Sequence, residues 1–279
     1  MSFLSRLFRR NPAPQPDDER DIESLIAPIA VPAIHAEATT AESSSQFGGE
    51  PRVPPGFSWP MRDGRPLAFL AQIDLAQVRA CSPIDWLPST GTLLFFYDVD
   101  EQPWGFDPKE RDGWCVIYGP DSDGWVEAQP PSTISSSSRL PRRNLAFRRI
   151  RSFPSGERPQ MEALGLNGGE VDRFYTMQGE EFGTGPRHQL GGYPMPIQSD
   201  QMEIEAQLGS HGIYAGDQRD ERVQALEQGA SEWRLLFQVD SDEKVDVMWG
   251  DAGMLYFWVR EADAREGRFD RAWLVLQCY

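Results

Sequence analysis

The feature that most constrains the fold is an imperfect internal repeat. Three short motifs occur twice, in the same order, along the 279 residues of the chain. They are Gly-Gly-x-Pro, then Gln-Ile-Asp or Gln-Val-Asp within an apolar run, then Gly-x-Leu-x-Phe, and they begin at residues 48, 72 and 91 and again at residues 191, 238 and 253. Each motif alone is weak, but three in a common order are hard to obtain by chance. The sequence therefore predicts two repeated halves that pack about a pseudo-two-fold axis.

The segments around these motifs are predicted to be strands. Short apolar runs that are rich in aromatic and branched side chains, and that end at Gly, Pro or Asp, are typical of buried strands. Short helical stretches are predicted near residues 17–30, 76–80, 172–177 and 221–229. The predicted fold class is α+β, with two β-rich repeated halves that share one core, a mostly antiparallel sheet and a few short helices. The predicted strands cover residues 66–75, 92–98, 113–119, 233–240, 253–259 and 272–279.

The repeat also suggests how the chain is divided. The Pro-rich start predicts a flexible tail, and a helix, a strand and a polar linker should precede the repeat. Because Pro32 lacks a backbone N–H, the strand at residues 31–37 is predicted to lie at a sheet edge. The expected parts are a tail (1–19), a helix, edge strand and linker (20–46), and a duplicated core (47–279) with a first copy (about 47–130), a connecting region (about 131–186) and a second copy (about 187–279).

Two glutamines mark matching places in the copies. Gln72 and Gln238 each lie inside an apolar run that should be buried, and a buried amide must find hydrogen-bond partners. We expect both to bond the irregular backbone of the adjacent Gly-Gly-x-Pro segment, and contact with a ligand is the alternative. The predicted structural or pocket residues are these two glutamines, the turn glycines Gly49 and Gly192, and Trp249 in its Trp-Gly-Asp segment.

An acidic segment in the second copy offers a candidate metal site. Asp240, Asp242 and Asp246 lie close in sequence, and hard cations prefer several oxygen ligands at one point. The spacing of an EF-hand loop is absent, so this hypothesis depends on crowding alone. An acidic turn between two strands, whose Asp side chains bond their own backbone, is the alternative.

A candidate catalytic site involves the same segment. His188 precedes the second Gly-Gly-x-Pro motif, and with Asp240, Asp242 and Asp251 it would form an acid–base site between the two halves. The alternative is a histidine that bonds backbone carbonyls. The sequence has no phosphate-binding loop, dinucleotide fingerprint, zinc-protease motif or nucleophile elbow. An enzyme is therefore not favoured, and no cofactor is predicted.

The charge of the chain bears on its partners. A formal net charge of −16 and a pI of about 4.6 oppose nucleic-acid binding, although six arginines lie between residues 139 and 151. The same charge favours a protein partner with a basic face. Five tryptophans fall in segments rich in Pro and Gly, where they would suit a protein or peptide groove: Trp59, Trp86, Trp104, Trp114 and Trp125.

Cysteine usage and hydropathy predict a cytoplasmic protein. Cys81, Cys115 and Cys278 have no metal-ligand spacing and indicate buried reduced thiols. No apolar run approaches the roughly 20 residues that would span a bilayer. Residues 1–10 combine Phe and Leu with Arg, which would allow weak membrane-surface contact, and a frayed tail is the alternative. The sequence predicts no oligomeric state.

Several of these motifs together resemble the YwqG-like family of bacterial proteins, a family without an established activity. The resemblance covers about residues 20–279, and the motifs that carry it are Phe47-Gly-Gly-x-Pro, Leu70-Ala-Gln-Ile-Asp-Leu, His188-x-x-Gly-Gly-Tyr-Pro, Leu236-Phe-Gln-Val-Asp-Ser-Asp, Trp249-Gly-Asp-x-Gly and Gln277-Cys. It implies a cytosolic α+β protein with a repeated β-rich core. Members are associated with bacterial toxin systems, so the resemblance also implies an immunity-like or partner-binding role.

Taken together, these features predict a protein-binding or accessory module, with an immunity-like role as one form of it. The competing hypothesis is a hydrolase-like or metal-dependent enzyme whose site lies between the two halves. The two differ in one geometric respect: an enzyme requires His188 and the aspartates to converge in an open pocket.

Overall fold

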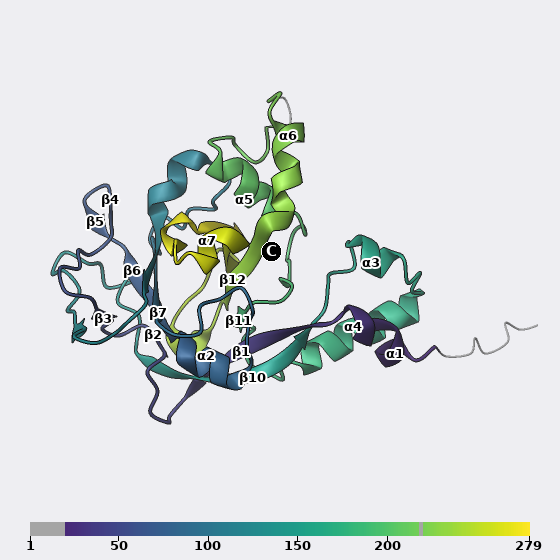
Figure 1. Ribbon diagram of the computed structural model, residues 1–279, viewed down its shortest axis with the longest axis horizontal. Coiled ribbons are helices and arrows are strands. Elements are labelled where there is room, and N and C mark those ends of the chain that lie inside the picture. The colour runs from purple at the N-terminus through teal and green to yellow at the C-terminus, as the bar shows by residue number, and fades with distance from the viewer. Residues whose placement is uncertain (1–19, 218–219) are drawn as a thin grey trace, which may run out of the picture.

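A computed structural model describes residues 20–217 and 220–279 of the chain (Figure 1). The predicted tail at residues 1–19, and with it the predicted membrane contact of residues 1–10, lies outside the described residues. None of the helices in the described part is long and apolar enough to cross a membrane.

One large antiparallel sheet dominates the fold. It has ten strands, in the spatial order β14-β13-β12-β11-β1-β10-β2-β6-β7-β8. Two small ribbons accompany it: β3 (Arg52–Val53) pairs with β9 (Val126–Glu127), and β4 (Met61–Arg62) pairs with β5 (Arg65–Pro66). The strands of the main sheet are β1 (Val31–Thr39), β2 (Gln46–Phe47), β6 (Ala68–Asp74), β7 (Thr92–Tyr97), β8 (Trp114–Gly119), β10 (Arg143–Ser152), β11 (Gln189–Leu190), β12 (Trp233–Asp240), β13 (Met254–Arg260) and β14 (Trp273–Gln277).

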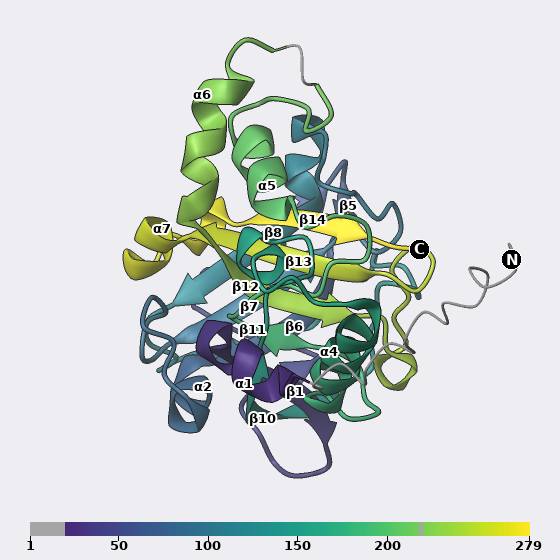
Figure 2. The same ribbon diagram turned by 90° about the vertical axis from the view of Figure 1, so that its right-hand side faces the viewer.

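Short helices surround the sheet, so the prediction of a mixed fold with a mostly antiparallel sheet and short helices is confirmed. Helices α1 and α4 lie together beside the central strands, while α5 and α6 stand at the β14 end of the molecule (Figures 1 and 2). The longest helix, α4, starts with a capping box in which Asn167 and Glu170 bond each other's backbone N–H groups. The helices are α1 (Ile22–Ile26), α2 (Leu75–Cys81), α3 (Pro159–Glu162), α4 (Gly168–Glu180), α5 (Met202–Ser210), α6 (Val223–Glu227) and α7 (Glu261–Arg265), and single 3-10 turns cover Ala27–Ile29, Pro108–Gly113, Gln228–Glu232, Glu243–Val245 and Phe269–Arg271.

The first long strand, β1, lies in the centre of the sheet, so the prediction of an edge strand is wrong. It pairs with β10 along its whole length and with β11 at Ile34 and His35. The N–H of Ala36 points toward β11, where it donates to His188 O. Because N–H groups alternate in direction along a strand, the missing N–H of Pro32 falls on the same side, beyond the end of the two-residue β11. A proline is therefore tolerated in a central strand.

The order of strands is the same on both sides of the central pair β1–β10. Outward from β10 come β2, β6, β7 and β8, and outward from β1 come β11, β12, β13 and β14. Each short strand thus pairs with the central strand that belongs to the other part of the sequence: β2 with β10, and β11 with β1. The early and late parts of the chain are therefore interlocked through the middle of the sheet.

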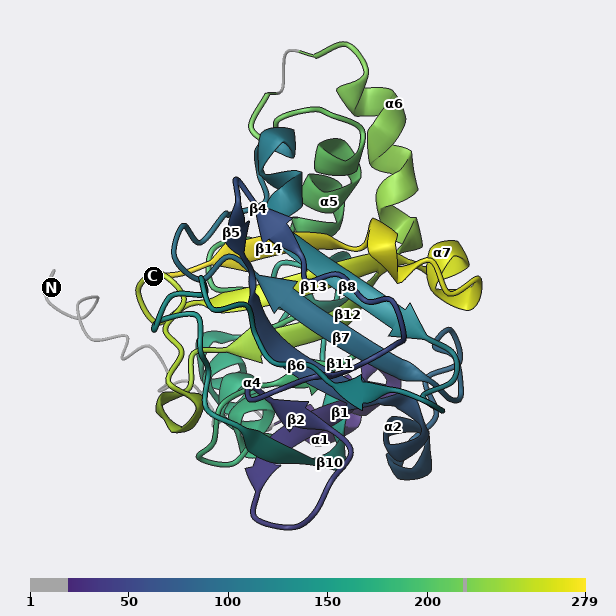
Figure 3. The same cartoon turned by 90° about the vertical axis from the view of Figure 1, so that its left-hand side faces the viewer.

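The sheet curls until its two ends face each other, and the space between them forms the main core. Figure 3 shows β6, β7 and β8 in front of β12 and β13. The ring of Phe95 on β7 lies 5.1 Å from both Phe237 on β12 and Phe257 on β13. At the open edges, Trp114 on β8 meets Trp273 on β14, with ring centres 5.1 Å apart. Burial of these aromatic side chains between facing strands is the main apolar contribution to the fold.

Candidate functional site

The two glutamines are buried, and each bonds the backbone around its neighbouring turn. Gln72 Oε1 accepts from Arg52 N at 2.9 Å, and its Nε2 donates to Ser44 O at 2.9 Å. Gln238 Oε1 accepts from Met195 N at 2.9 Å, and its Nε2 donates to Arg187 O at 2.8 Å. Both amides are thereby committed to backbone groups on either side of a Gly-Gly-x-Pro segment.

The turns themselves require glycine. Gly49 and Gly192 have φ of +71° and +74°, a region that favours glycine. A Cβ on Gly49 would lie 2.7 Å from Arg142 Cβ, and one on Gly192 would lie 2.7 Å from Ser152 Cβ. Each turn therefore packs closely against the end of β10 or the residue before it.

The structure brings His188 together with Asp240 and Asp242, immediately before β11. His188 Nδ1 accepts from the backbone N–H of Asp240 at 3.1 Å. This role places the ring proton on Nε2, which lies 3.3 Å from Asp242 Oδ2. The His188 side chain is 1% exposed, and its ring centre lies 4.7 Å from that of Phe47.

Asp242, the hydrogen-bond partner of His188 Nε2, is held in its charged form. Burial alone would raise the pKa of Asp242, but hydrogen bonds from His188 and from Lys244 N outweigh it and hold that pKa below its ordinary value. Both ring nitrogens of His188 therefore have partners within the protein. The ring has no free nitrogen for a substrate and no exposed face, so this arrangement supports a structural pair and gives no support to acid–base catalysis.

The other aspartates of the acidic segment do not join this pair. Asp240 Oδ2 accepts from Arg187 N at 2.8 Å. Asp246 is an exposed residue with φ of +56°, and Asp251 is exposed, with its backbone O bonded to Tyr279 N. Trp249 is buried and donates from Nε1 to Asp240 O at 3.2 Å. Within residues 20–217 and 220–279, no three His, Cys, Asp or Glu side chains are placed to hold a metal ion.

A second buried histidine, His35, was not identified from the sequence as a site residue. Its Nε2 lies 2.8 Å from Pro186 O, and its Nδ1 lies 3.0 Å from both Arg148 and Glu37. Burial lowers the pKa of His35, which favours the neutral ring with Nδ1 accepting from Arg148. On the edge strand that was predicted for residues 31–37, a histidine would be expected to face solvent. His35 is buried because β1 lies in the centre of the sheet.

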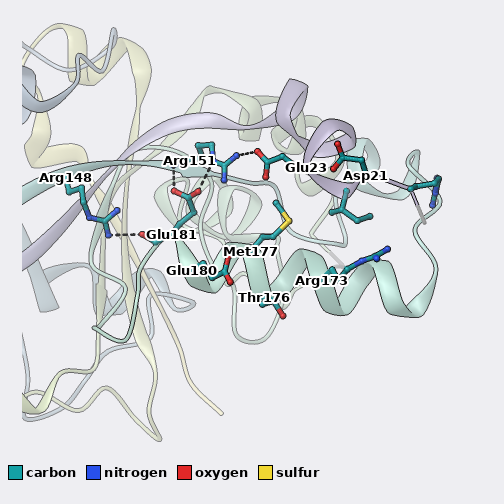
Figure 4. A pocket seen from close by; sticks show the side chains of 11 residues that line it. Asp21, Glu23, Arg148, Arg151, Arg173, Thr176, Met177, Glu180 and Glu181 are labelled. Carbon is teal, nitrogen blue, oxygen red and sulfur yellow. Dashed lines mark hydrogen bonds and ion pairs between the residues drawn. The ribbon is translucent and has the colours of Figure 1, made fainter. Parts of the chain in front are cut away.

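An open hollow of about 620 Å³ lies where α1 and α4 approach the end of β10 (Figure 4). We call it the charged groove. Figure 4 shows Arg151 between Glu23 on α1 and Glu181 just after α4, and Arg151 Nε donates to Glu181 at 2.7 Å. The formal charges of the groove cancel, because its lining has four arginines, four carboxylates and three uncharged residues: Arg20, Arg148, Arg151, Arg173, Asp21, Glu23, Glu180, Glu181, Ile22, Thr176 and Met177.

A second hollow, about 400 Å³, lies beside the turn that contains Gly192. We call it the aromatic pocket, because rings and aliphatic groups form most of its lining: Ile84, Trp86, Tyr193, Pro194, Trp233 and Trp258. One wall carries the ion pair of Arg158 with Glu203, at 2.7 Å, and the Arg158 guanidinium lies 5.3 Å from the centre of the Tyr193 ring.

The tryptophans that the sequence places in loops have different roles. Trp114 and Trp125 are buried, at 1% and 6% exposure, so the prediction that they would form an exposed groove is wrong. Trp86 lines the aromatic pocket, and Trp104 is 37% exposed elsewhere on the surface. The sequence indicates which residues are aromatic, but the curvature of the sheet decides which of them face solvent.

Comparison with known proteins identifies the family. A search of curated proteins finds no match for the chain. A family model described as a domain of unknown function, DUF1963, matches residues 45–278. The match begins just before β2 and ends just after β14, so it includes both glutamines, His188, and β12 and β13 of the aromatic pocket, whereas β1 precedes it. The chain belongs to the DUF1963 family, a domain of unknown function.

Proposed function

We propose that this chain is a protein-binding or accessory module, and that the charged groove is its contact surface. The observation that carries the proposal is the contrast between the two polar clusters. The His188–Asp242 pair is buried and fully bonded, whereas the charged groove is open and presents guanidinium groups, carboxylates and the apolar side chain of Met177. Arginine and apolar side chains with a polar rim are typical of protein interfaces.

Charge favours a partner with a basic face. Arg148 and Arg151 are already bonded to Glu181 and Glu23. Asp21 and Glu180 are exposed carboxylates at the groove. The Asp21 carboxylate accepts from Ser24 of α1, and among the described residues neither carboxylate is paired with an arginine. Basic side chains of a partner would therefore meet these carboxylates, and the net charge of −16 would steer such a partner at low salt.

We also propose that the role is immunity-like and that the chain acts in the bacterial cytoplasm, as the YwqG-like resemblance suggests. The support for this finer assignment is that resemblance together with the acidic charge of the chain. An immunity-like protein needs a binding surface and no catalytic centre.

The internal duplication is part of the same proposal. Besides the repeated motifs, three structural features support it: the matching strand order on both sides of β1–β10, the matching bonds of Gln72 and Gln238, and the matching bonds of Gln46 and Gln189. Gln46 Nε2 donates to Gly48 O and Glu50 O, and Gln189 Nε2 donates to Gly191 O and Tyr193 O. The bond pattern further suggests that each copy begins with its central strand, β1 or β10.

The test is affinity capture from native cells with the full chain as bait. We expect a partner protein to be recovered at low salt from the wild-type chain and to be lost with Glu180→Lys, which adds positive charge to the groove. The matched control is Glu162→Lys, an exposed acid on α3 outside the groove. Recovery of the same partner in equal amount by all three baits would exclude the groove as the contact surface.

A further inference from the structure

We propose that the aromatic pocket binds an uncharged segment of a partner protein that carries proline and aromatic side chains around a tight turn. This binding site is separate from the charged groove and does not depend on it. The inference comes from the first half of the molecule, where the matching surface is covered by a segment of the chain itself.

The two surfaces can be matched through the register of the strands. Leu235 on β12 pairs with Trp258 on β13, next to a shift in register between Leu235 and Phe237. Phe69 on β6 pairs with Phe96 on β7, next to a shift between Phe69 and Ala71. Leu235 and Trp258 line the aromatic pocket, so Phe69 and Phe96 are the corresponding positions in the first half.

In the first half, this position is covered. Residues 53–60, with the sequence Val-Pro-Pro-Gly-Phe-Ser-Trp-Pro, follow the first Gly-Gly-x-Pro turn and pack onto Phe96. The ring of Phe57 lies 6.0 Å from that of Phe96, and the ring of Trp59 lies 5.5 Å from it. Trp59 Nε1 also donates to Leu67 O at 2.8 Å. A segment with prolines and two aromatic rings, bent by a turn in which Phe57 N donates to Pro54 O at 3.1 Å, therefore fits this surface.

In the second half, the chain takes another route after the corresponding turn. Ile197 N and Gln198 N both donate to Gln277 Oε1, which directs the chain toward β14 and then into α5. The surface beside Leu235 and Trp258 is left with a hollow of about 400 Å³. The indole N–H of Trp258 is buried without a hydrogen-bond partner among the described residues, so the free protein leaves one donor of the pocket lining unused.

The walls of the pocket select the chemistry of the occupant. Arg158 is paired with Asp200 and Glu203, and Arg234 is paired with Glu261 at 2.9 Å. Among the residues that line the pocket, the formal charges of Arg158 and Arg234 are balanced by those of Glu203 and Asp85, so the walls offer no net attraction to a charged segment. The rest of the lining is mostly apolar and includes the rings of Trp86, Tyr193, Trp233 and Pro194, which suits proline and aromatic side chains.

The probe is the octapeptide Val-Pro-Pro-Gly-Phe-Ser-Trp-Pro, titrated into the full chain by isothermal titration calorimetry. We expect saturable binding of one peptide per chain. Trp86→Ala should weaken it by at least about tenfold, because a stacked ring in a pocket centre is a dominant contact. Pro83→Glu, at the exposed rim of the pocket, should weaken it similarly without touching the core. Trp104→Ala, an exposed tryptophan outside the pocket, and Glu180→Lys, in the charged groove, should leave the affinity unchanged.

Four results would overturn the inference. They are no binding at millimolar peptide, wild-type affinity of the Trp86→Ala and Pro83→Glu variants for the peptide, and equal binding of a peptide with both aromatics replaced by alanine. The fourth is concentration-dependent dimerisation of the wild-type chain that Pro83→Glu abolishes, because it would show that a second copy occupies the pocket. Loss of partner capture by Glu180→Lys bears only on the charged groove, so the two proposals fail separately.

Discussion

At the scale of single residues, buried amides and rings hold irregular backbone in place. Gln72, Gln238 and His188 are each surrounded by apolar side chains, and each has its polar atoms bonded to the chain. The burial of the glutamines could be predicted from the apolar runs that contain them. The approach of His188 to Asp240 and Asp242 was also predicted, but the burial of its ring and the bond from Asp240 N were not, because these partners lie at or just after the end of β12, about 50 residues later in the sequence.

Replacement of Gln238 by alanine should destabilise the protein by about 1–3 kcal/mol, because it leaves the half-buried Met195 N and Arg187 O without their partner. Urea unfolding measures the change. The control is Gln198→Ala, an exposed glutamine whose side chain has no hydrogen bond among those described, and it should cost less than about 0.5 kcal/mol. Equal stability of Gln238→Ala and wild type would show that this amide does not hold the turn.

The ionisation of Glu205 should lower the free energy of unfolding as the pH rises. Burial and the nearby charge of Glu203 raise the pKa of Glu205 from 4.5 to about 7. Below pH 4.5 both the folded and the unfolded states keep the proton, and between pH 4.5 and 7 only the unfolded state loses it, so stability is lost across that range. Glu205→Gln should therefore stabilise the protein by up to about 3 kcal/mol at pH 8 and have little effect at pH 4.

The measurement is urea unfolding of wild type and Glu205→Gln at both pH values. Glu162→Gln, at an exposed position on α3, is the control and should change stability equally little at each pH. A Glu205→Gln effect that is the same at pH 4 and pH 8 would contradict the raised pKa.

At the scale of elements, the long strands were predictable and their neighbours were not. The predicted runs at residues 92–98, 233–240 and 253–259 correspond to β7, β12 and β13 within a residue or so. The two-residue strands β2 and β11 leave no periodic pattern to detect, yet they join each half to the central pair. The aromatic pocket was equally hidden, because segments near residues 31, 84, 158, 193, 203, 233 and 258 meet there only after the sheet has curled.

The turn after β11 should be intolerant of any side chain. Gly192→Ala combines a positive φ of +74° with a Cβ that would lie 2.7 Å from Ser152 Cβ and 2.8 Å from Ala33 Cβ. Gly56→Ala is the matched control, since Gly56 has a φ of +78° and nothing within 4 Å of the added Cβ. We expect the control to lose about 1–2 kcal/mol of folding stability, from the strain of the backbone alone. Gly192→Ala should lose at least about 2 kcal/mol more, because the added methyl group overpacks the turn. Equal losses in thermal unfolding would show that the turn has room to move.

At the scale of the whole molecule, the interlocked strand order should make the chain unfold as one unit. Each half depends on the other for the partner of its short strand, and Phe95 packs against Phe237 and Phe257 across the core. Urea transitions followed by tryptophan fluorescence and by far-UV circular dichroism should therefore coincide. Two separated transitions would indicate halves that are stable independently.

At the scale of the whole molecule, both proposed binding sites lie on the surface. His188 and Asp242, the polar pair that resembles a catalytic centre, are buried and hydrogen-bonded to other groups of the protein. The charged groove and the aromatic pocket are open. Although the lining of the groove is neutral, the chain as a whole is strongly acidic. The net negative charge of the whole chain would thus attract a basic partner over long range, and the side chains of the groove would make the direct contacts with it.

The most direct test of this account is the dissociation constant of the captured partner for the purified wild-type chain, Glu180→Lys and Glu162→Lys, measured across a range of salt. The account predicts that binding to wild type weakens as salt rises, that Glu180→Lys weakens it by at least about tenfold at low salt, consistent with the loss of a close charge pair, and that Glu162→Lys leaves it within about threefold of wild type. The same affinity for all three proteins, independent of salt, would contradict the account.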